Sequence, residues 1–144
     1  MHPILKPRLA PRQKLKRLWA VLWASPYSLL GLVLCAIGWL AGVRMQRVNG
    51  VLEATLSSHS GARPRWCRRL PFSAITLGHV VIAADGLTQE SLRAHERVHV
   101  QQYERWGPLF VPAYLGIGLV MWVRGLDPYW DNPFEVEARR LGGC

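Results

Sequence analysis

The segment "AHERVHVQQYERWG" (residues 94–107) places two histidines and a glutamate at a spacing that could bind and use a metal ion. A four-residue step turns a helix by only about 40°, so His95 and His99 point the same way and can bind one ion at about 2.0 to 2.1 Å. Glu96 then lies beside the ion, where its carboxylate can take a proton from an activated water. We predict Zn2+ bound by His95 and His99, with Glu96 as the general base.

A catalytic zinc also needs a third protein ligand and an open position for water. The segment "DNPFEVEARRLGG" predicts a second helix, capped by Asn132 and begun by Pro133, that carries two candidates, Glu135 and Glu137. These lie about 160° apart around the helix, so only one of them can face the ion. Glu135 also stands where a capping-box glutamate would reach back to Asn132, so the residues alone leave the choice open.

The two segments together resemble a known family. "HERVH", followed about thirty-five residues later by "FEVEA", resembles the gluzincin metallopeptidases, in particular the minigluzincins and the membrane-bound group that includes the prenyl-protein proteases. Small bacterial proteins with a minigluzincin-like core are similar over about residues 73–141. In this family the first glutamate of a Glu-x-x-Ala pattern binds zinc, which implies Glu135 as the ligand here. Arg139 stands where the family usually has an aspartate.

The elements that must position these residues can be predicted as well. Residues 74–83 are rich in β-branched side chains and precede an Asp-Gly turn, which predicts one strand from Ala74 to Ala83. A helix from Gln89 to Trp106 should follow, capped by Thr88 and ended by the Gly-Pro pair after Trp106. The expected fold class is mainly α with a small β element (α+β), built around a zincin-like core of strand, HExxH helix and glutamate-bearing helix.

Four further expectations concern the surroundings of the site. Gln102 is either a group that orients a zinc ligand or a glutamine at the surface edge. Tyr129 and His79 are the nearest side chains that could polarise a carbonyl, although both have structural roles open to them. The predicted strand could pair with an extended peptide substrate or simply pack on the helix.

The positive charge of the chain is concentrated in its N-terminal half. Residues 1–72 carry twelve Lys and Arg against one acid, while residues 73–144 carry six against eight. From Lys14 onward, Leu15, Leu18, Trp19 and Leu22 share one helical face, the pattern of a basic helix on a membrane surface. With no nucleic-acid-binding motif present, a lipid membrane is the expected partner and no nucleic acid is expected.

Residues 26–43 form an uncharged run of about 27 Å, close to the roughly 30 Å thickness of the bilayer core. We expect a retained membrane anchor, with a cleaved signal peptide and a buried core helix as alternatives. Six basic residues precede the run, which predicts a cytoplasmic N-terminus. The resemblance to small bacterial proteins implies that the membrane is a bacterial inner membrane. The expected organisation is 1–47, basic N-terminus and membrane anchor; 48–72, linker; and 73–144, minigluzincin-like zinc domain.

A second uncharged run, residues 107–123, cannot be a simple single crossing if the zinc prediction holds, because it would separate His95 and His99 from Glu135. The three cysteines, Cys35, Cys67 and Cys144, are scattered and are assigned no chemistry.

The expected function is that of a small membrane-anchored zinc metallopeptidase acting on a peptide or protein substrate. The alternatives are a catalytically inactive zinc-binding structural membrane protein, and a basic membrane-surface or nucleic-acid adaptor without metal.

Overall fold

The computed structural model describes residues 11–40, 42–56 and 73–143, so most of the expected linker and two cysteines, Cys67 and Cys144, lie outside the described residues. The helices are α1 (Pro11–Trp23), α2 (Ser25–Leu40), α3 (Gly86–Trp106), α4 (Phe110–Val123) and α5 (Pro133–Gly142), with the short 3-10 helix η2 (Gly107–Leu109) between α3 and α4. The strands are β1 (Arg44–Val48), β2 (Val51–Thr55), β3 (Ala74–Leu77) and β4 (Val80–Ala83). The α+β fold class is confirmed.

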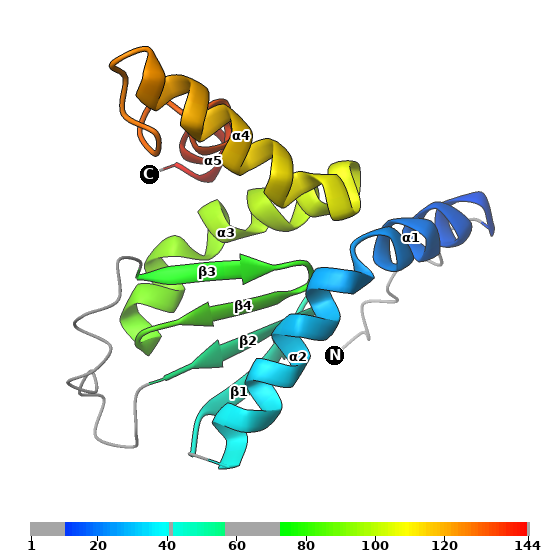
Figure 1. Ribbon diagram of the computed structural model, residues 1–144. Helices are drawn as coiled ribbons and strands as arrows, with labels where there is room; N and C mark the ends of the chain where they lie inside the picture. Colours follow the sequence, from blue (N-terminus) through cyan, green and yellow to red (C-terminus); the bar gives the residue numbers. More distant parts are fainter. Residues whose placement is uncertain (1–10, 41, 57–72, 144) are drawn as a thin grey trace.

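The four strands form one mixed sheet in the order β1-β2-β4-β3. Two antiparallel hairpins, β1–β2 and β3–β4, are joined by the parallel pairing of β2 with β4. Because β3 pairs only with β4, it forms one edge of the sheet, the edge nearer to the C-terminal helices (Figure 1).

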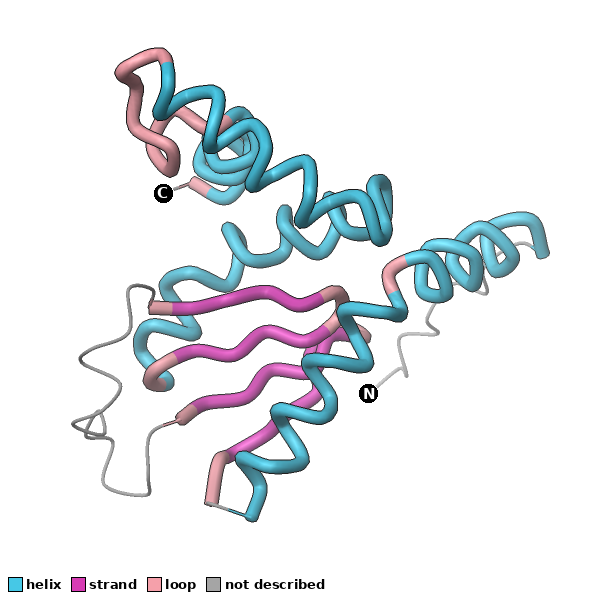
Figure 2. Tube along the Cα trace, in the orientation of Figure 1, coloured by secondary structure: helices cyan, strands magenta, loops and turns pink. Residues whose placement is uncertain are grey.

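The sheet lies between α2 on one face and α3 on the other (Figure 2). On the α2 side the contact is close: a Cβ on Gly31 would lie 2.7 Å from the Cβ of Val80, and Cys35 is buried against Val80 and Ala54. On the α3 side Val100 packs in a buried cluster with strand residues. Burial of these apolar side chains joins α2 to one face of the sheet and α3 to the other.

Two expectations about the β structure are wrong. The single strand predicted from Ala74 to Ala83 is two strands that turn at Gly78, which has a φ of +61° suited to glycine. The linker predicted from residue 48 begins inside β1, and β2 follows it after a turn at Asn49 and Gly50, both with positive φ. The expected boundary between anchor and zinc domain therefore runs through the sheet.

The C-terminal helices return the chain to α3. At Gly107 (φ +54°) the chain turns through η2 into α4, and a second turn after α4 leads into α5, which packs along α3. A Cβ on Gly142 would lie 2.6 Å from the Cα of His95, so α5 approaches α3 where only glycine fits. Helix α3, which precedes the 107–123 run, and helix α5, which follows it, thus pack against each other.

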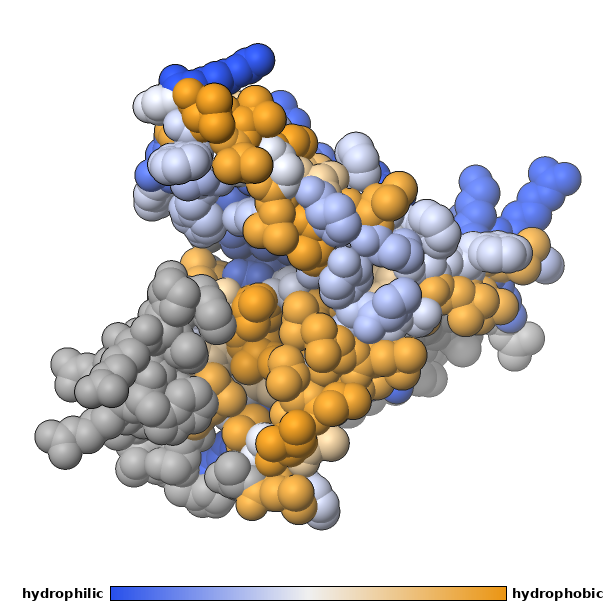
Figure 3. All heavy atoms as spheres, in the orientation of Figure 1, coloured by the Kyte–Doolittle hydropathy of each residue, from blue (hydrophilic) through white to orange (hydrophobic). Residues whose placement is uncertain are grey.

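Much apolar surface on the helices remains exposed. Exposed large apolar side chains of α2 are Leu29, Leu30, Leu32, Val33, Leu34, Ile37, Trp39 and Leu40. In Figure 3 they form a broad hydrophobic area over α2. By length and composition, the helical stretch Gly86–Val123 is long and apolar enough to cross a membrane, and α1 and α2 pass the same test together across a 64° bend.

Candidate metal site

Helix α3 presents the two histidines to the interior of the protein. The helix begins at Gly86 with Asp85 as its N-cap, whose carboxylate accepts a hydrogen bond from the Thr88 backbone N–H at 2.8 Å, so the predicted cap at Thr88 is wrong. From there His95 and His99 fall on the buried face, with 5% and 8% of their surfaces exposed. Their rings lie 4.9 Å apart between centroids, one helical turn from each other.

Helix α5 brings Glu135 to the same place. The side chain of Asn132 caps the helix by accepting from the backbone N–H of Phe134 at 3.1 Å, and Pro133 occupies the first turn, as predicted. Glu135 is buried against the histidines, whereas Glu137 points to another part of α3. The described contacts of Glu135 do not include the capping-box bond to Asn132 that the sequence left open.

The three side chains form a compact triangle. The Nε2 atoms of His95 and His99 lie 3.2 Å apart, and the carboxylate oxygens of Glu135 lie 3.3 Å from His95 Nε2 and 3.4 Å from His99 Nε2. Ligand atoms at about 2.0 to 2.1 Å from a tetrahedral zinc ion lie about 3.3 Å apart. Buried Glu135 Oε2 also has no hydrogen-bond partner among the described residues. The group can therefore hold one metal ion.

The charge state of Glu135 suits such an ion. Burial opposes ionisation, but the close contacts with His95 and His99 and a hydrogen bond from the Tyr114 hydroxyl at 2.7 Å outweigh it and hold the pKa of this carboxyl far below its usual range. Burial likewise opposes protonation of His99, yet its bond and proximity to Glu135 raise the pKa of the imidazole above its usual value.

Gln102 fixes the orientation of His99. It is completely buried, and its amide nitrogen donates to the Phe134 carbonyl at 3.0 Å and to the Glu137 carboxylate at 2.8 Å. The amide oxygen must then accept at 2.8 Å from Nδ1 of His99. With the proton on Nδ1, Nε2 faces the triangle as a ligand atom. Gln102 is therefore not a glutamine at the surface edge, and it holds His99 in place.

His95 lacks an equivalent partner. Its buried Nδ1 has no hydrogen bond to any described residue. Arg139 stands where the gluzincins, which this sequence resembles, usually have an aspartate. Its guanidinium carbon lies 4.7 Å from the centroid of the Trp130 ring, and the guanidinium group donates to the Trp130 carbonyl. Among the described residues, Nδ1 of His99 thus has a hydrogen-bond partner and Nδ1 of His95 has none.

Glu96 and the edge strand border the same cavity as the triangle. The Thr76 hydroxyl of β3 donates to Glu96 Oε2 at 2.6 Å, so the carboxylate is held by one oxygen. The cavity has a volume of about 830 Å3 and is lined by α2, β3, α3, α4, α5 and the loop before α5. Most of the lining side chains are apolar or aromatic, among them Leu30 and Leu77.

Of the two residues considered for polarising a carbonyl, only Tyr129 lines this cavity. Burial, with the nearby Glu135 carboxylate, raises the pKa of Tyr129 to about 12, so its hydroxyl stays protonated. His79 lies elsewhere, with Nε2 at 3.0 Å from Glu104. The sequence reasoning missed Tyr114, although it is the only side chain with a hydroxyl group in the uncharged 107–123 run.

No family model, curated protein or solved structure matches this chain in the three comparisons with known proteins. The case for a function therefore depends on the geometry of the site.

Proposed function

We propose that this protein is a small membrane-associated, zinc-dependent metallopeptidase of gluzincin type. The observation that carries the proposal is the buried His95–His99–Glu135 group: the two Nε2 atoms lie 3.2 Å apart, and each lies 3.3 to 3.4 Å from a different oxygen of Glu135, close to the ligand spacing of a zinc site. His95, His99 and Glu135 all line the cavity, which leaves room beside them for water and substrate.

A bound Zn2+ at this position supplies a Lewis acid and lowers the pKa of a water ligand to about 7. Glu96 would accept a proton from the attacking water and transfer it to the nitrogen of the leaving amine as the carbon–nitrogen bond breaks. The hydroxyl of Thr76 holds Oε2 of Glu96, so Oε1 is the oxygen available for this transfer. The protonated hydroxyl of Tyr129 can donate to the developing oxyanion.

The substrate chain would lie along β3. This strand is an edge of the sheet, and residues 73–77 line the cavity beside α3. An extended peptide can add to such an edge through main-chain hydrogen bonds while its side chains enter the apolar cavity. This arrangement would place a peptide bond near Glu96 and the triangle.

Membrane association would involve the exposed face of α2 and the apolar face of α1. A full crossing by α2, as expected from residues 26–43, would carry the sheet packed on it into the hydrocarbon. Within the described residues β1 and β3 each have one unpaired edge, and unpaired backbone groups in lipid cost several kcal/mol each. We therefore propose that α1 and α2 lie at the membrane surface. The side of the membrane on which the site lies stays a prediction.

A second candidate function is a zinc-binding structural protein without catalytic activity. It is favoured by the missing partner of His95 Nδ1 and by Arg139 in place of an aspartate. Both candidates need the same ligands, so they differ only in the role of Glu96.

Metal content and turnover of matched variants test both candidates. Purified protein should hold one zinc per chain by elemental analysis, and Glu135→Gln should lose it while Glu137→Gln, two residues away on the same helix, should keep most of it. Glu96→Gln should keep zinc and abolish hydrolysis of a casein-derived peptide mixture. A wild-type protein that binds zinc but hydrolyses nothing would favour the structural candidate, and loss of zinc in Glu137→Gln alone would refute the assignment of Glu135.

A further inference from the structure

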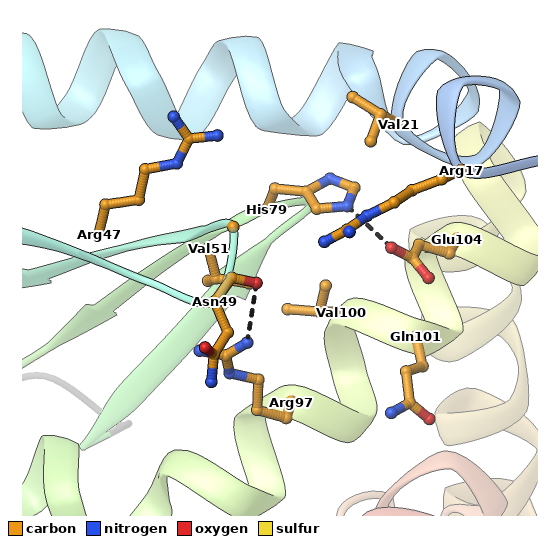
Figure 4. A pocket seen from close by; sticks show the side chains of 11 residues that line it. Arg17, Val21, Arg47, Asn49, Val51, His79, Arg97, Val100, Gln101 and Glu104 are labelled. Atoms are coloured by element: carbon orange, nitrogen blue, oxygen red, sulfur yellow. Dashed lines mark hydrogen bonds and ion pairs between the residues drawn. The ribbon is translucent and has the colours of Figure 1, made fainter. Parts of the chain in front are cut away.

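A second cavity, of about 640 Å3, lies away from the metal triangle, between α1, the β1–β2 hairpin and the C-terminal half of α3 (Figure 4). It shares no lining residue with the cavity above the triangle. Three arginines from three different elements line it: Arg17 of α1, Arg47 of β1 and Arg97 of α3. The fold thus brings positively charged side chains from distant parts of the sequence to one cavity.

Two of these arginines have unused hydrogen-bond donors. Arg97 donates to the backbone carbonyls of Val48 and Asn49, so it stabilises the hairpin turn. Arg17 and Arg47 form no hydrogen bond or ion pair with any residue in the ranges 11–40, 42–56 and 73–143. Each guanidinium group carries five donors that an oxygen-rich ligand could use.

The nearby carboxylates do not balance this charge. Among the described residues that line the cavity, Glu104 is the only acidic one, and its Oε1 lies 3.0 Å from His79 Nε2. Glu53, close to Arg97, is 2% exposed and accepts two hydrogen bonds from Arg93, both at 3.0 Å. No carboxylate of the described residues therefore pairs with Arg17 or Arg47, and their guanidinium groups are available to an anionic ligand.

The position of the cavity indicates the class of ligand. Arg17 lies on the cavity face of α1, while Leu18, Trp19 and Leu22 are exposed and lie around the opposite side of the same helix. A helix that rests on a membrane through its apolar face holds its basic residues at the depth of the lipid headgroups. The forked donors of arginine match the oxygens of a phosphate group.

We propose that this cavity binds a phosphate group through Arg17 and Arg47, either in the headgroup of an anionic phospholipid or in a soluble phosphate compound. Asn49 and Gln101, which also line the cavity, offer further polar contacts. The proposal does not depend on zinc or on peptide hydrolysis.

Two double variants of the full chain test this site. Arg17→Gln/Arg47→Gln removes both free guanidinium groups, and Lys14→Gln/Lys16→Gln removes the same charge from α1 at positions that do not line the cavity. Binding is measured by flotation with phosphatidylcholine vesicles with and without phosphatidylglycerol, and by NMR titration of detergent-solubilised protein with inorganic phosphate. Zinc content and the circular dichroism spectrum show whether each variant is folded.

The arginine variant should bind phosphatidylglycerol vesicles at least about tenfold more weakly than the lysine variant, because charge-assisted hydrogen bonds are lost. If inorganic phosphate shifts the wild-type resonances and not those of the arginine variant, the ligand includes soluble phosphate; if only vesicles discriminate, it is a lipid headgroup. Equal losses in the two variants would show general surface attraction and would overturn the site. Unchanged binding in the arginine variant would do the same.

Discussion

Gln102 should control zinc affinity although it does not touch the ion. Gln102→Met keeps the volume of this completely buried side chain but removes the hydrogen bond of 2.8 Å that orients His99. Loss of such a partner typically weakens metal binding about 10- to 100-fold, or about 1.4 to 2.7 kcal/mol. The Phe134 carbonyl, which accepts from Gln102 at 3.0 Å, also loses its donor, at a cost of about 1 to 3 kcal/mol in folding stability.

Two measurements separate these effects. Competition with a chromogenic chelator gives the zinc dissociation constant, and urea unfolding of the metal-free protein gives its stability. Gln101→Met, an exposed neighbour on the same helix, is the matched control. Gln102→Glu keeps an acceptor for His99 but faces Glu137, so it should lose stability and retain zinc affinity. Zinc affinity within about twofold of wild type in Gln102→Met would refute the orienting role.

Three other perturbations have defined outcomes. Tyr114→Phe removes the 2.7 Å hydrogen bond to Glu135 and should weaken zinc binding several-fold by the same competition assay, and unchanged affinity would contradict a role for Tyr114. Gly142→Ala places a Cβ 2.6 Å from the Cα of His95 and should cost about 1 to 3 kcal/mol in unfolding free energy, whereas Gly116→Ala, with open space around it, should not. Because the pKa of His99 is raised in the folded protein, the protonated imidazole stabilises the metal-free fold fully below the pKa of His99 in the unfolded chain, about 6.5, and this stabilisation is lost as pH rises. The metal-free protein should therefore melt at a lower temperature at pH 8 than at pH 5.5. Zinc affinity should change in the opposite direction, because protons compete for the same nitrogen, and parallel trends would contradict this assignment.

The histidine pair could be predicted because it depends only on local geometry. The spacing of His95 and His99 fixes their common face once the segment is helical. The choice between Glu135 and Glu137 could not be made from the residues, because it depends on how α5 is rotated against α3. In the structure Glu137 bonds Gln102 and Arg105, which leaves Glu135 beside the histidines.

The β structure was predicted less well. The Asn49–Gly50 pair is a strong hairpin signal that could have revealed β1 and β2, but four of the five β1 residues are exposed, so the strand lacks the usual alternation of buried and exposed residues. The attachment of α2 to the sheet was hidden for another reason. This helix carries no charge and is apolar on most sides, so the side that faces the sheet is seen only in the structure, where Gly31 and Cys35 pack against Val80 and Ser28 accepts a hydrogen bond from the His79 backbone.

The proposed function requires that His95, His99 and Glu135 bind one zinc ion. X-ray absorption spectroscopy of the zinc-loaded full chain measures the ligands and their distances directly. We expect nitrogen and oxygen ligands at about 2.0 to 2.1 Å, a multiple-scattering signal from two imidazoles, and loss of one imidazole in His99→Ala. A sulfur ligand at about 2.3 Å, or a wild-type spectrum without imidazole, would contradict it.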